Sequence, residues 1–363
     1  MEENKKKGNK KFKIFIIIFI IAILFFSQKE NQEKLIEILN SLKINQKTLK
    51  LIESFPVEED VKDLDLHDKS IMKWRDNKLS FLELDGTLSW EKEFNLEEPY
   101  IFFGEKYIYG IDKSSGDIYF LDKKGETINR VQLKTQIFNI KESHSNLISH
   151  IRNLNMESIN ILDKDGNLIG NNLVKDKNIL TYSTNKDGSK YVLSLLNLKE
   201  GALKSQIEIF DINGEKLASI DLEKEIVINS EFTDNEEVII LTDKGLYYIK
   251  DNKILWKKQF DLIKDIYLDK DKIYVLYSNY LESIYFNGRT KSKMSFSEEY
   301  KKILSSDKHI FLYGDKYIVG IQDEKEILKY ESDEKILGLY GAKSNLMIWN
   351  PNKVNIFSIT NKK

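Results

Sequence analysis

Hydrophobic and polar positions alternate with a period of two along most of the chain, and short turn sequences interrupt the alternation at regular intervals. Three segments show the pattern clearly: IYFLDKKGETINRVQL (118–133), INILDKDGNLIGNNLV (159–174) and IEIFDINGEKLASIDL (207–222). Each has an apolar alternation, an Asp, a Gly three residues later and a second alternation. A period of two is typical of β-strands, and Asp followed by Gly between two such runs is typical of a hairpin turn. The pattern therefore predicts repeated β-hairpins.

Similar hairpins recur along the chain, and each turn centres on a residue that tolerates a left-handed backbone. The predicted turn residues are Gly86, Gly125, Gly166, Gly214, Asn252 and Gly288. A weaker seventh hairpin is predicted to turn near Asp333. Successive turns lie 36 to 48 residues apart, close to the repeat lengths of β-propeller blades.

A second β-rich pair precedes each hairpin, and eight such inner pairs can be counted. The predicted fold is an all-β propeller with eight blades, although the 48-residue interval between Gly166 and Gly214 leaves seven blades open. The last inner pair, residues 345–359, has no outer hairpin after it. We expect residues 55–68 to supply the missing strand, because closing the ring removes the exposed sheet edges.

Before residue 56 the pattern changes from alternation to a continuous apolar run. Residues 14–26 are 13 apolar residues in succession, and six Lys and two Glu precede them. This predicts a basic cytoplasmic tail (1–13), a transmembrane signal-anchor (14–27), a helical stalk (28–55) and a propeller domain (56–363). The positive-inside rule then places the propeller outside the cell membrane. The run is short for a span, so a cleaved signal peptide or a buried helix remain alternatives.

The stalk prediction rests on an apolar stripe at Leu35, Leu39, Leu42 and Leu49. This spacing is typical of an amphipathic helix. A dimerising coiled coil is the other interpretation, but about two heptads with a polar break are fewer than stable pairing requires. The oligomeric state therefore stays open.

Composition and motifs exclude several classes of function. The formal net charge of −2 lacks the broad positive field of a nucleic-acid-binding protein. The chain has no cysteine, which excludes disulfides, thiol nucleophiles and Cys-ligated zinc. Its four histidines show no metal-binding spacing and are expected at the surface or the channel rim, and DKDGN (163–167) fails the spacing of a calcium loop. We therefore predict no catalytic residue, no cofactor and no metal.

Trp90 and Trp256 each stand four residues beyond a predicted turn residue, on strands where a large ring can pack between blades. The motif ELDGTLSW (83–90) resembles the quinoprotein-dehydrogenase type of propeller, and YSTNKDGSKYVLSL (182–195) is similar to the turn of TolB-like propellers. The quinoprotein resemblance would imply a quinone and Ca²⁺, but the vicinal disulfide of many members is absent here. The whole layout resembles an uncharacterised membrane-anchored propeller family, a domain of unknown function, of low-GC Gram-positive bacteria.

These features favour a non-enzymatic function. We expect a membrane-anchored, extracellular propeller that binds or scaffolds a protein or envelope component through the loops on one face. Its other partner would be membrane lipid, contacted through the N-terminal helix, and no nucleic acid is expected. The alternative is a propeller hydrolase or lyase acting on cell-wall polysaccharide, which would require carboxylates about 5 to 10 Å apart at the channel mouth.

Overall fold

The computed structural model describes residues 46–67, 69–104, 106–144, 146–153, 156–197 and 204–362. The predicted cytoplasmic tail, the predicted anchor and residues 28–45 of the predicted stalk lie outside these residues. Every element in the described part of the chain is a β-strand.

The strands form eight four-stranded sheets, or blades, numbered here in chain order and given from the innermost to the outermost strand. Blade 1 is β2 (Asp63–His67), β3 (Ser70–Arg75), β4 (Lys78–Glu83) and β5 (Leu88–Glu93). Blade 2 is β6 (Pro99–Phe103), β7 (Ile108–Asp112), β8 (Asp117–Leu121) and β9 (Thr127–Gln132). Blade 3 is β10 (Asn139–Ser143), β11 (Asn146–Asn153), β12 (Met156–Leu162) and β13 (Leu168–Lys175). Blade 4 is β14 (Asn178–Thr184), β15 (Lys190–Asn197), β16 (Lys204–Asp211) and β17 (Lys216–Glu223).

The second half of the ring repeats the same order. Blade 5 is β18 (Val227–Phe232), β19 (Val238–Thr242), β20 (Gly245–Lys250) and β21 (Lys253–Gln259). Blade 6 is β22 (Ile263–Leu268), β23 (Lys272–Tyr277), β24 (Tyr280–Tyr285) and β25 (Thr290–Ser295). Blade 7 is β26 (Lys302–Ser306), β27 (His309–Tyr313), β28 (Tyr317–Gln322) and β29 (Lys325–Glu331). Blade 8 is β30 (Gly338–Ala342), β31 (Asn345–Asn350), β32 (Lys353–Asn361) and β1 (Lys47–Pro56).

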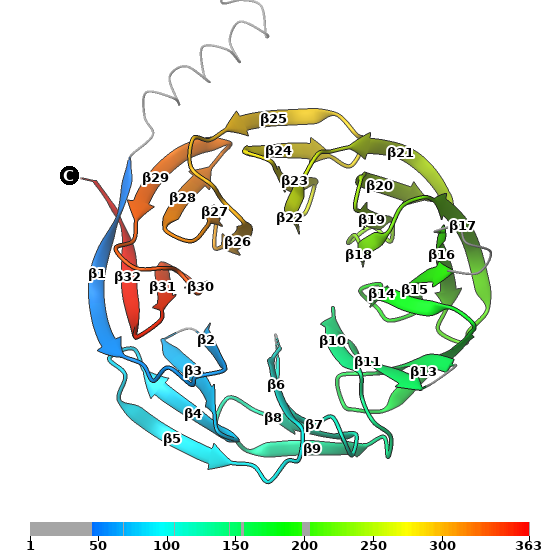
Figure 1. Ribbon diagram of the computed structural model, residues 1–363, viewed down its shortest axis with the longest axis horizontal. Coiled ribbons are helices and arrows are strands. Elements are labelled where there is room, and N and C mark those ends of the chain that lie inside the picture. Colours follow the sequence, from blue (N-terminus) through cyan, green and yellow to red (C-terminus); the bar gives the residue numbers. More distant parts are fainter. Residues whose placement is uncertain are drawn as a thin grey trace, which may run out of the picture. The chain divides into compact units, whose positions relative to one another are not determined.

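The blades stand side by side in a ring, with the first strand of each at the centre and the fourth along the circumference (Figure 1). This confirms the predicted eight-bladed propeller. The alternative of seven blades is wrong, since the 48-residue interval from Gly166 to Gly214 spans β13 of blade 3 and β14, β15 and β16 of blade 4, which are seven or eight residues long.

The ring is closed by a strand from the beginning of the described chain. β1 pairs with β32, and side-chain contacts between Thr48 and Thr360 and between Ser54 and Asn355 set an antiparallel register. The sequence-based prediction that residues 55–68 supply this strand is therefore wrong, because residues 63–67 form the innermost strand of blade 1 instead. Residues 47–55 were also predicted to be helical and are extended, since pairing with the open edge of β32 satisfies their backbone.

The Asp and Gly residues of the repeat hold the hairpins between the third and fourth strands. In blade 2, Asp122 Oδ1 accepts hydrogen bonds from the backbone amides of Lys124 (2.8 Å) and Glu126 (2.9 Å). Gly125 adopts a φ of 79°, which L-residues rarely adopt. Beside each turn the strand register shifts by one residue, as a β-bulge. The repeated Asp and Gly pattern is thus explained by the requirements of one type of turn and of the β-bulge beside it.

The hairpin of blade 7 turns at a different place from the one predicted. Asp323 (φ 50°) and Glu324 (φ 55°) form the two-residue turn between β28 and β29. Asp333 lies after β29, in the connection to blade 8. The prediction failed because neither turn residue is Gly or Asn, although Asp is among the residues that enter the left-handed region more readily than most.

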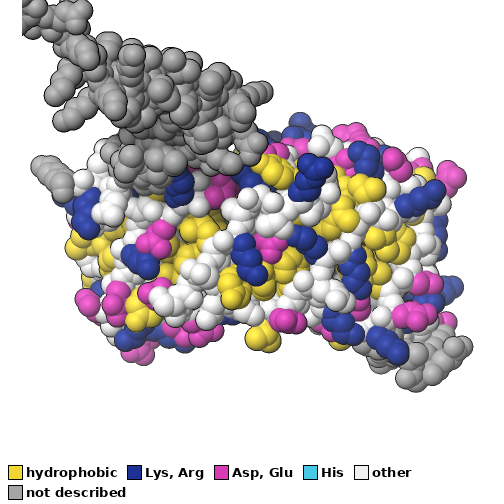
Figure 2. All heavy atoms as spheres, turned by 90° about the horizontal axis from the view of Figure 1, so that it is seen from above, with side chains coloured by type: hydrophobic (Ala, Val, Ile, Leu, Met, Phe, Trp, Pro, Cys, Tyr) yellow, Lys and Arg dark blue, Asp and Glu magenta, His cyan; other side chains and the backbone are white. Residues whose placement is uncertain are grey.

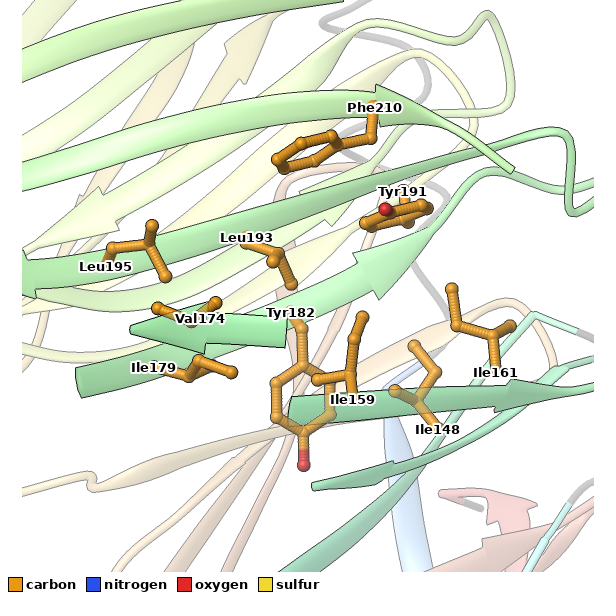
Figure 3. Packing of buried hydrophobic residues seen from close by; sticks show 10 residues of the cluster. All are labelled: Ile148, Ile159, Ile161, Val174, Ile179, Tyr182, Tyr191, Leu193, Leu195 and Phe210. Carbon is orange, nitrogen blue, oxygen red and sulfur yellow. The ribbon is translucent and has the colours of Figure 1, made fainter. Parts of the chain in front are cut away.

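The hydrophobic core is divided among the interfaces between blades. Each of the eight interfaces in the described ring buries its own apolar cluster. Figure 3 shows the cluster between blades 3 and 4, where Ile148, Ile159 and Ile161 face Tyr191 and Leu193. Because each blade contributes to two clusters, it is buried on both faces only when it has a neighbour on each side.

Large side chains of the outer strands also pack against the turn glycine of the next blade. A Cβ atom built on Gly125 would lie 2.7 Å from the Trp90 ring, and one on Gly86 would lie 2.7 Å from Phe55. The same contact joins Trp256 to Gly288, at 3.1 Å. Glycine is therefore required at these turns for its backbone and for the space that it leaves to the neighbouring blade.

We predict that Gly125→Ala lowers the free energy of unfolding by about 2 to 4 kcal/mol, the sum of a left-handed alanine and a clash with Trp90. Gly214→Ala is the matched control, because Gly214 has a φ of 88° but only Tyr191 Oη, 3.9 Å away, near its missing Cβ. This control should cost only about 1 to 2 kcal/mol. Denaturant unfolding of both variants measures the difference, and equal losses would show that the Trp90 contact contributes nothing.

Candidate functional site: the centre and two mouths of the ring

The residues singled out in the sequence belong to the framework of the ring. Gly86, Gly125, Gly166, Gly214 and Gly288 all have φ between 79° and 88° at turns between third and fourth strands. Asn252, with φ 62°, follows Asp251 in the corresponding turn of blade 5.

The two tryptophans lie on outer strands and contact the next blade. Trp90 stacks on Phe81 of its own blade, with the ring centroids 5.3 Å apart. Trp256 stacks on Tyr248 at 5.4 Å and donates a hydrogen bond from Nε1 to the carbonyl oxygen of Phe286 in blade 6 (2.8 Å). None of the predicted residues lines the centre of the ring, so the candidate site must be sought elsewhere.

The innermost strands define two ends of the ring. We call the end where these strands begin the entry mouth, and the end where they finish the exit mouth. A cavity of about 380 Å³ at the exit mouth lies among β10, β18 and β22. Its wall includes Lys141, Glu231 and Tyr267 from those strands. A cavity of this size suits a small ligand or a side chain of a partner.

Lys141 is one of the two lysines that line this exit-mouth cavity. Its Nζ lies 3.9 Å from a Glu231 carboxylate oxygen and 3.5 Å from the backbone oxygen of Tyr182. Burial lowers the pKa of the Lys141 amine, and the Glu231 carboxylate opposes that shift. The cavity wall therefore has both signs of charge, with the carboxylates of Glu142, Glu231, Asp234 and Asp269 against the two lysines Lys141 and Lys270.

The innermost strand of blade 1 has two carboxylates on the same side. Asp63 and Asp65 are two residues apart on β2, both half-buried, and burial raises the pKa of both. The pKa of Asp65 rises to about 6, with the Asp63 carboxylate adding to the effect of burial. Among the described residues no Lys, Arg or His forms an ion pair with either carboxylate.

Elsewhere in the ring, the buried glutamates have cationic partners, while the buried Asp112 accepts hydrogen bonds from the backbone amides of Glu97, Glu98 and Ser114. Five glutamates less than a tenth exposed each form an ion pair with Lys or Arg. These pairs are Glu157 with Arg152, Glu208 with Lys216, Glu225 with Lys257, Glu237 with Lys250 and Glu282 with Lys258. Since an unpaired buried charge is costly, Asp63 and Asp65 differ from these glutamates, as does Asp265 on β22: burial raises the pKa of each, and no ion pair within the described residues compensates it.

Two of the four histidines depart from their expected exposure. His150 and His309 are 2% and 6% exposed, so the prediction of surface or rim positions is wrong for them. His150 lies 3.0 Å from Glu157, and burial lowers the pKa of its imidazole. In the described part of the chain no group of three or more His, Cys, Asp or Glu is arranged to hold a metal ion.

Exposed large apolar side chains gather at the entry mouth. Seven of them lie there and form what we call the apolar rim: Phe138, Met156, Ile226, Ile228, Leu262, Tyr280 and Leu337. Four of the seven stand directly before an innermost strand, in blades 3, 5, 6 and 8. Leu262 is 76% exposed. No described exposed side chain of this kind lies at the exit mouth.

The remaining exposed apolar residues are on the outer wall. They belong to β1, β5, β9, β13, β17 and β21. Figure 2 shows part of this wall, where hydrophobic side chains alternate with Lys, Arg, Asp and Glu. Such mixing is ordinary for a protein surface, whereas the apolar rim is confined to one end of the ring.

No helix in the described residues is long and apolar enough to cross a membrane. The predicted anchor at 14–27 lies outside those residues and stays a prediction.

Comparison with protein families identifies the chain. Residues 45–359 match a family described as a family of unknown function, DUF5711. The chain belongs to this family. The predicted membership of a propeller family of unknown function is thus confirmed, while its membrane anchorage stays a prediction. No curated protein matches the sequence at a significant level.

Solved structures of similar shape are propellers with little sequence identity to this DUF5711 chain. BamB from Moraxella catarrhalis is 11% identical, with a TM-score of 0.57, covering 85% of this chain and 99% of that one. The C-terminal WD40 domain of Sif2 is 11% identical, with a TM-score of 0.58 and coverage of 87% and 97%. The Dos1 propeller is 11% identical, with a TM-score of 0.60 and coverage of 86% and 96%. At this identity the likeness shows the fold alone.

The sequence contained a weak signal for the carboxylates of β2. Asp63 and Asp65 alternate with Leu64 and Leu66, so both must lie on one side of a strand. The sequence predicts ring closure for this segment, and a closing strand lies along the circumference, away from the centre. The apolar rim could not be read from sequence, because its members come from separate connections and turns.

We predict that Asp65→Asn stabilises the protein at neutral pH. A raised carboxyl pKa means that the folded state binds the proton more tightly than the unfolded chain. The ionised carboxylate therefore destabilises the fold as pH rises from about 4 to about 6, and the full cost is present above that range. The variant should gain about 1 to 3 kcal/mol at neutral pH and nothing below about pH 4.

Denaturant unfolding at several pH values measures this effect, with the exposed Glu59→Gln as the control variant. A loss of stability in Asp65→Asn at neutral pH would show that the carboxylate is compensated.

Proposed function

We propose that this DUF5711 propeller is a non-enzymatic binding or scaffold module that docks a protein or cell-envelope component on its entry mouth. The apolar rim is the observation that carries the proposal. The rim exposes seven large apolar side chains at one end of the ring. Folding does not require them there, since other side chains already fill the blade interfaces.

The rim has the composition of a binding surface. The Arg152 guanidinium lies 3.8 Å from the Phe138 ring centroid, and the Lys293 ammonium lies 4.2 Å from that of Tyr280. Aromatic and Arg side chains are enriched where proteins bind each other. Four of the rim residues, Phe138, Ile226, Leu262 and Leu337, lie in connections outside the strand ladders, so they can vary without disturbing the core.

The proposed location of the propeller relative to the membrane is inferred from the N-terminal sequence. A basic segment followed by 13 apolar residues favours an uncleaved signal-anchor with the N-terminus in the cytoplasm. The propeller would then work on the outer side of the cell membrane, held by a single-pass anchor.

Site-specific photocrosslinking in cells tests the docking face. A benzoylphenylalanine replacing Leu262 should give discrete crosslinked protein or glycan adducts, because Leu262 is the most exposed residue of the rim. The same probe at Lys270, exposed at the exit-mouth end of the same innermost strand, is the matched control and should give none. Introducing Ile228→Asp should abolish the Leu262 adducts. Equal adducts from both positions, or none from Leu262, would contradict the proposed face.

A second function is favoured by one observation. Asp63 and Asp65 project from one side of β2, about 7 Å apart along the strand, and a carboxyl with a pKa near 6 can serve as a general acid. This is the separation expected of paired-carboxylate chemistry on a polysaccharide. A hydrolase or lyase acting on cell-wall polysaccharide is therefore the alternative.

Incubation with purified wall polysaccharide separates the two functions. If the binding function is correct, release of reducing ends should equal that of a sample without protein. Release by the wild-type chain that falls by about a hundredfold or more in Asp65→Asn would establish the alternative.

A further inference from the structure

An arginine covers one aromatic side chain of the apolar rim. Phe138 stands directly before β10, and the guanidinium of Arg152, near the end of β11, stacks 3.8 Å from its ring centroid. Met156 begins the next strand, and Lys175 lies opposite Met156 in the ladder of β12 and β13. All four side chains are exposed, and we call them the blade 3 patch. Two apolar side chains and two cations therefore share this part of the entry mouth.

A buried carboxylate holds the Arg152 side chain in place. Arg152 Nε donates a hydrogen bond to Oε1 of the buried Glu157 at 2.6 Å. Glu157 also accepts hydrogen bonds from Asn178 Nδ2 at 2.9 Å and from the Ile179 amide at 2.6 Å, both in blade 4. The guanidinium thus has an aromatic ring on one face and a fixed carboxylate on one edge. Such a group loses little further freedom when it binds a ligand, which favours affinity.

The contact with Glu157 leaves part of the hydrogen-bonding capacity of Arg152 unused. Burial alone would raise the pKa of Glu157, but donors from Asn178, Ile179 and Arg152 hold that pKa below its ordinary value. The ionised carboxylate is therefore shared among several donors. Among the hydrogen bonds of the described residues, none uses the two Nη nitrogens of Arg152. Each of these nitrogens carries N–H donors that can bind an acceptor at the surface.

Arginine is a rare choice in this chain, and Lys performs the same structural task elsewhere. Only four of the 56 Lys and Arg residues are Arg. The other four buried glutamates named above are paired with Lys. A Lys ammonium is therefore sufficient to neutralise a buried carboxylate in this ring. Arg adds a planar fork that can bind a second carboxylate by two parallel hydrogen bonds, which an ammonium cannot do.

The charge of the patch distinguishes one kind of anionic partner from others. Arg152 and Glu157 together have no net charge, and the formal net charge of the chain is −2. A polyanion or an anionic lipid surface is attracted by a cluster of uncompensated cations, which this pair does not provide. A single carboxylate beside a large apolar side chain requires only one fork and an apolar contact. Phe138 and Met156 supply that contact.

We propose that the blade 3 patch binds an acidic segment of a polypeptide partner. An Asp or Glu carboxylate of the partner accepts hydrogen bonds from the Arg152 Nη groups, and a neighbouring large apolar side chain packs on Phe138 and Met156. This inference rests on the proposed docking function and adds the chemistry of the partner. Arg152 is then a specificity-determining residue, since complementary charge at an interface selects among partners.

Selection of phage-displayed random peptides of about twelve residues on the full-length chain tests this chemistry. The recovered peptides should share an Asp or Glu next to a large apolar residue. In fluorescence polarisation, replacing that acid by Asn or Gln should lower the affinity by about tenfold or more. Peptides that Ile228→Asp displaces but that need no acid would overturn this inference and leave the docking function standing. Failure to recover any peptide that depends on the rim would contradict both.

Arg152→Lys tests whether the fork receives the carboxylate. The ammonium keeps a cation beside Glu157, so the midpoint of unfolding should stay, while affinity for the acidic peptide falls by about tenfold. Arg130→Lys is the matched control. Arg130 lies 4.9 Å from the Tyr119 ring centroid and donates a hydrogen bond to Asp117, but it is on the outer strand β9. Unchanged affinity in Arg152→Lys, or an equal loss in Arg130→Lys, would overturn the proposal.

NMR on the unmodified chain avoids any effect of substitution on folding. With only four arginines, ¹⁵N-Arg labelling gives a simple Nε–Hε spectrum. The Arg152 signal should shift when the acidic peptide saturates the chain, while the Arg130 signal stays in place. An unmoved Arg152 signal contradicts the proposal. Inorganic polyphosphate, added as a competitor at equal charge concentration, should leave the peptide bound, and its displacement would assign the patch to a polyanion and overturn the proposal.

Discussion

The constraint on which the structure depends is that every blade has two apolar faces and covers neither alone. Eight clusters of buried side chains lie between neighbouring blades, so the hydrophobic core is a circle of interfaces. An open row of blades would leave two faces and a strand edge in water. β1 removes both by joining β32, which is why a protein beginning at Glu58 would lack the outer strand of its last blade.

The turn chemistry follows from the same constraint. The Asp and Gly of each hairpin set the reversal between the third and fourth strands, and Gly also admits a large side chain of the preceding blade. Trp90 against Gly125 and Trp256 against Gly288 are two instances, and Phe55 against Gly86 extends the contact to the closing strand. Framework positions therefore account for the repeated sequence, and positions that differ between blades are those free to serve binding.

Charge distinguishes the framework from the candidate sites. Buried glutamates of the blades are paired with Lys or Arg, which keeps them ionised at little cost. Within the described part of the chain Asp63 and Asp65 have no such partner, and burial raises the pKa of both, an arrangement that costs stability. The apolar rim is costly in another way, because it exposes to water the side chains that folding normally buries. Both features lie at the entry mouth, where the ends of the innermost strands face outward.

The sequence by itself determined the repeat, most of the hairpin turns, the all-β class and the propeller, with eight blades favoured over seven, because strand alternation and turn residues are local and each copy reinforced the others. It misplaced the closing strand, since Leu49 fits a helical stripe and only the free edge of β32 makes residues 47–56 extended. It missed the Asp323–Glu324 turn, which has no Gly or Asn. Tertiary structure alone decided that Asp63 stands beside Tyr100, and that Phe138, Ile226 and Leu262 share one mouth. Ring closure brings together residues more than a hundred positions apart, and no local pattern encodes that distance.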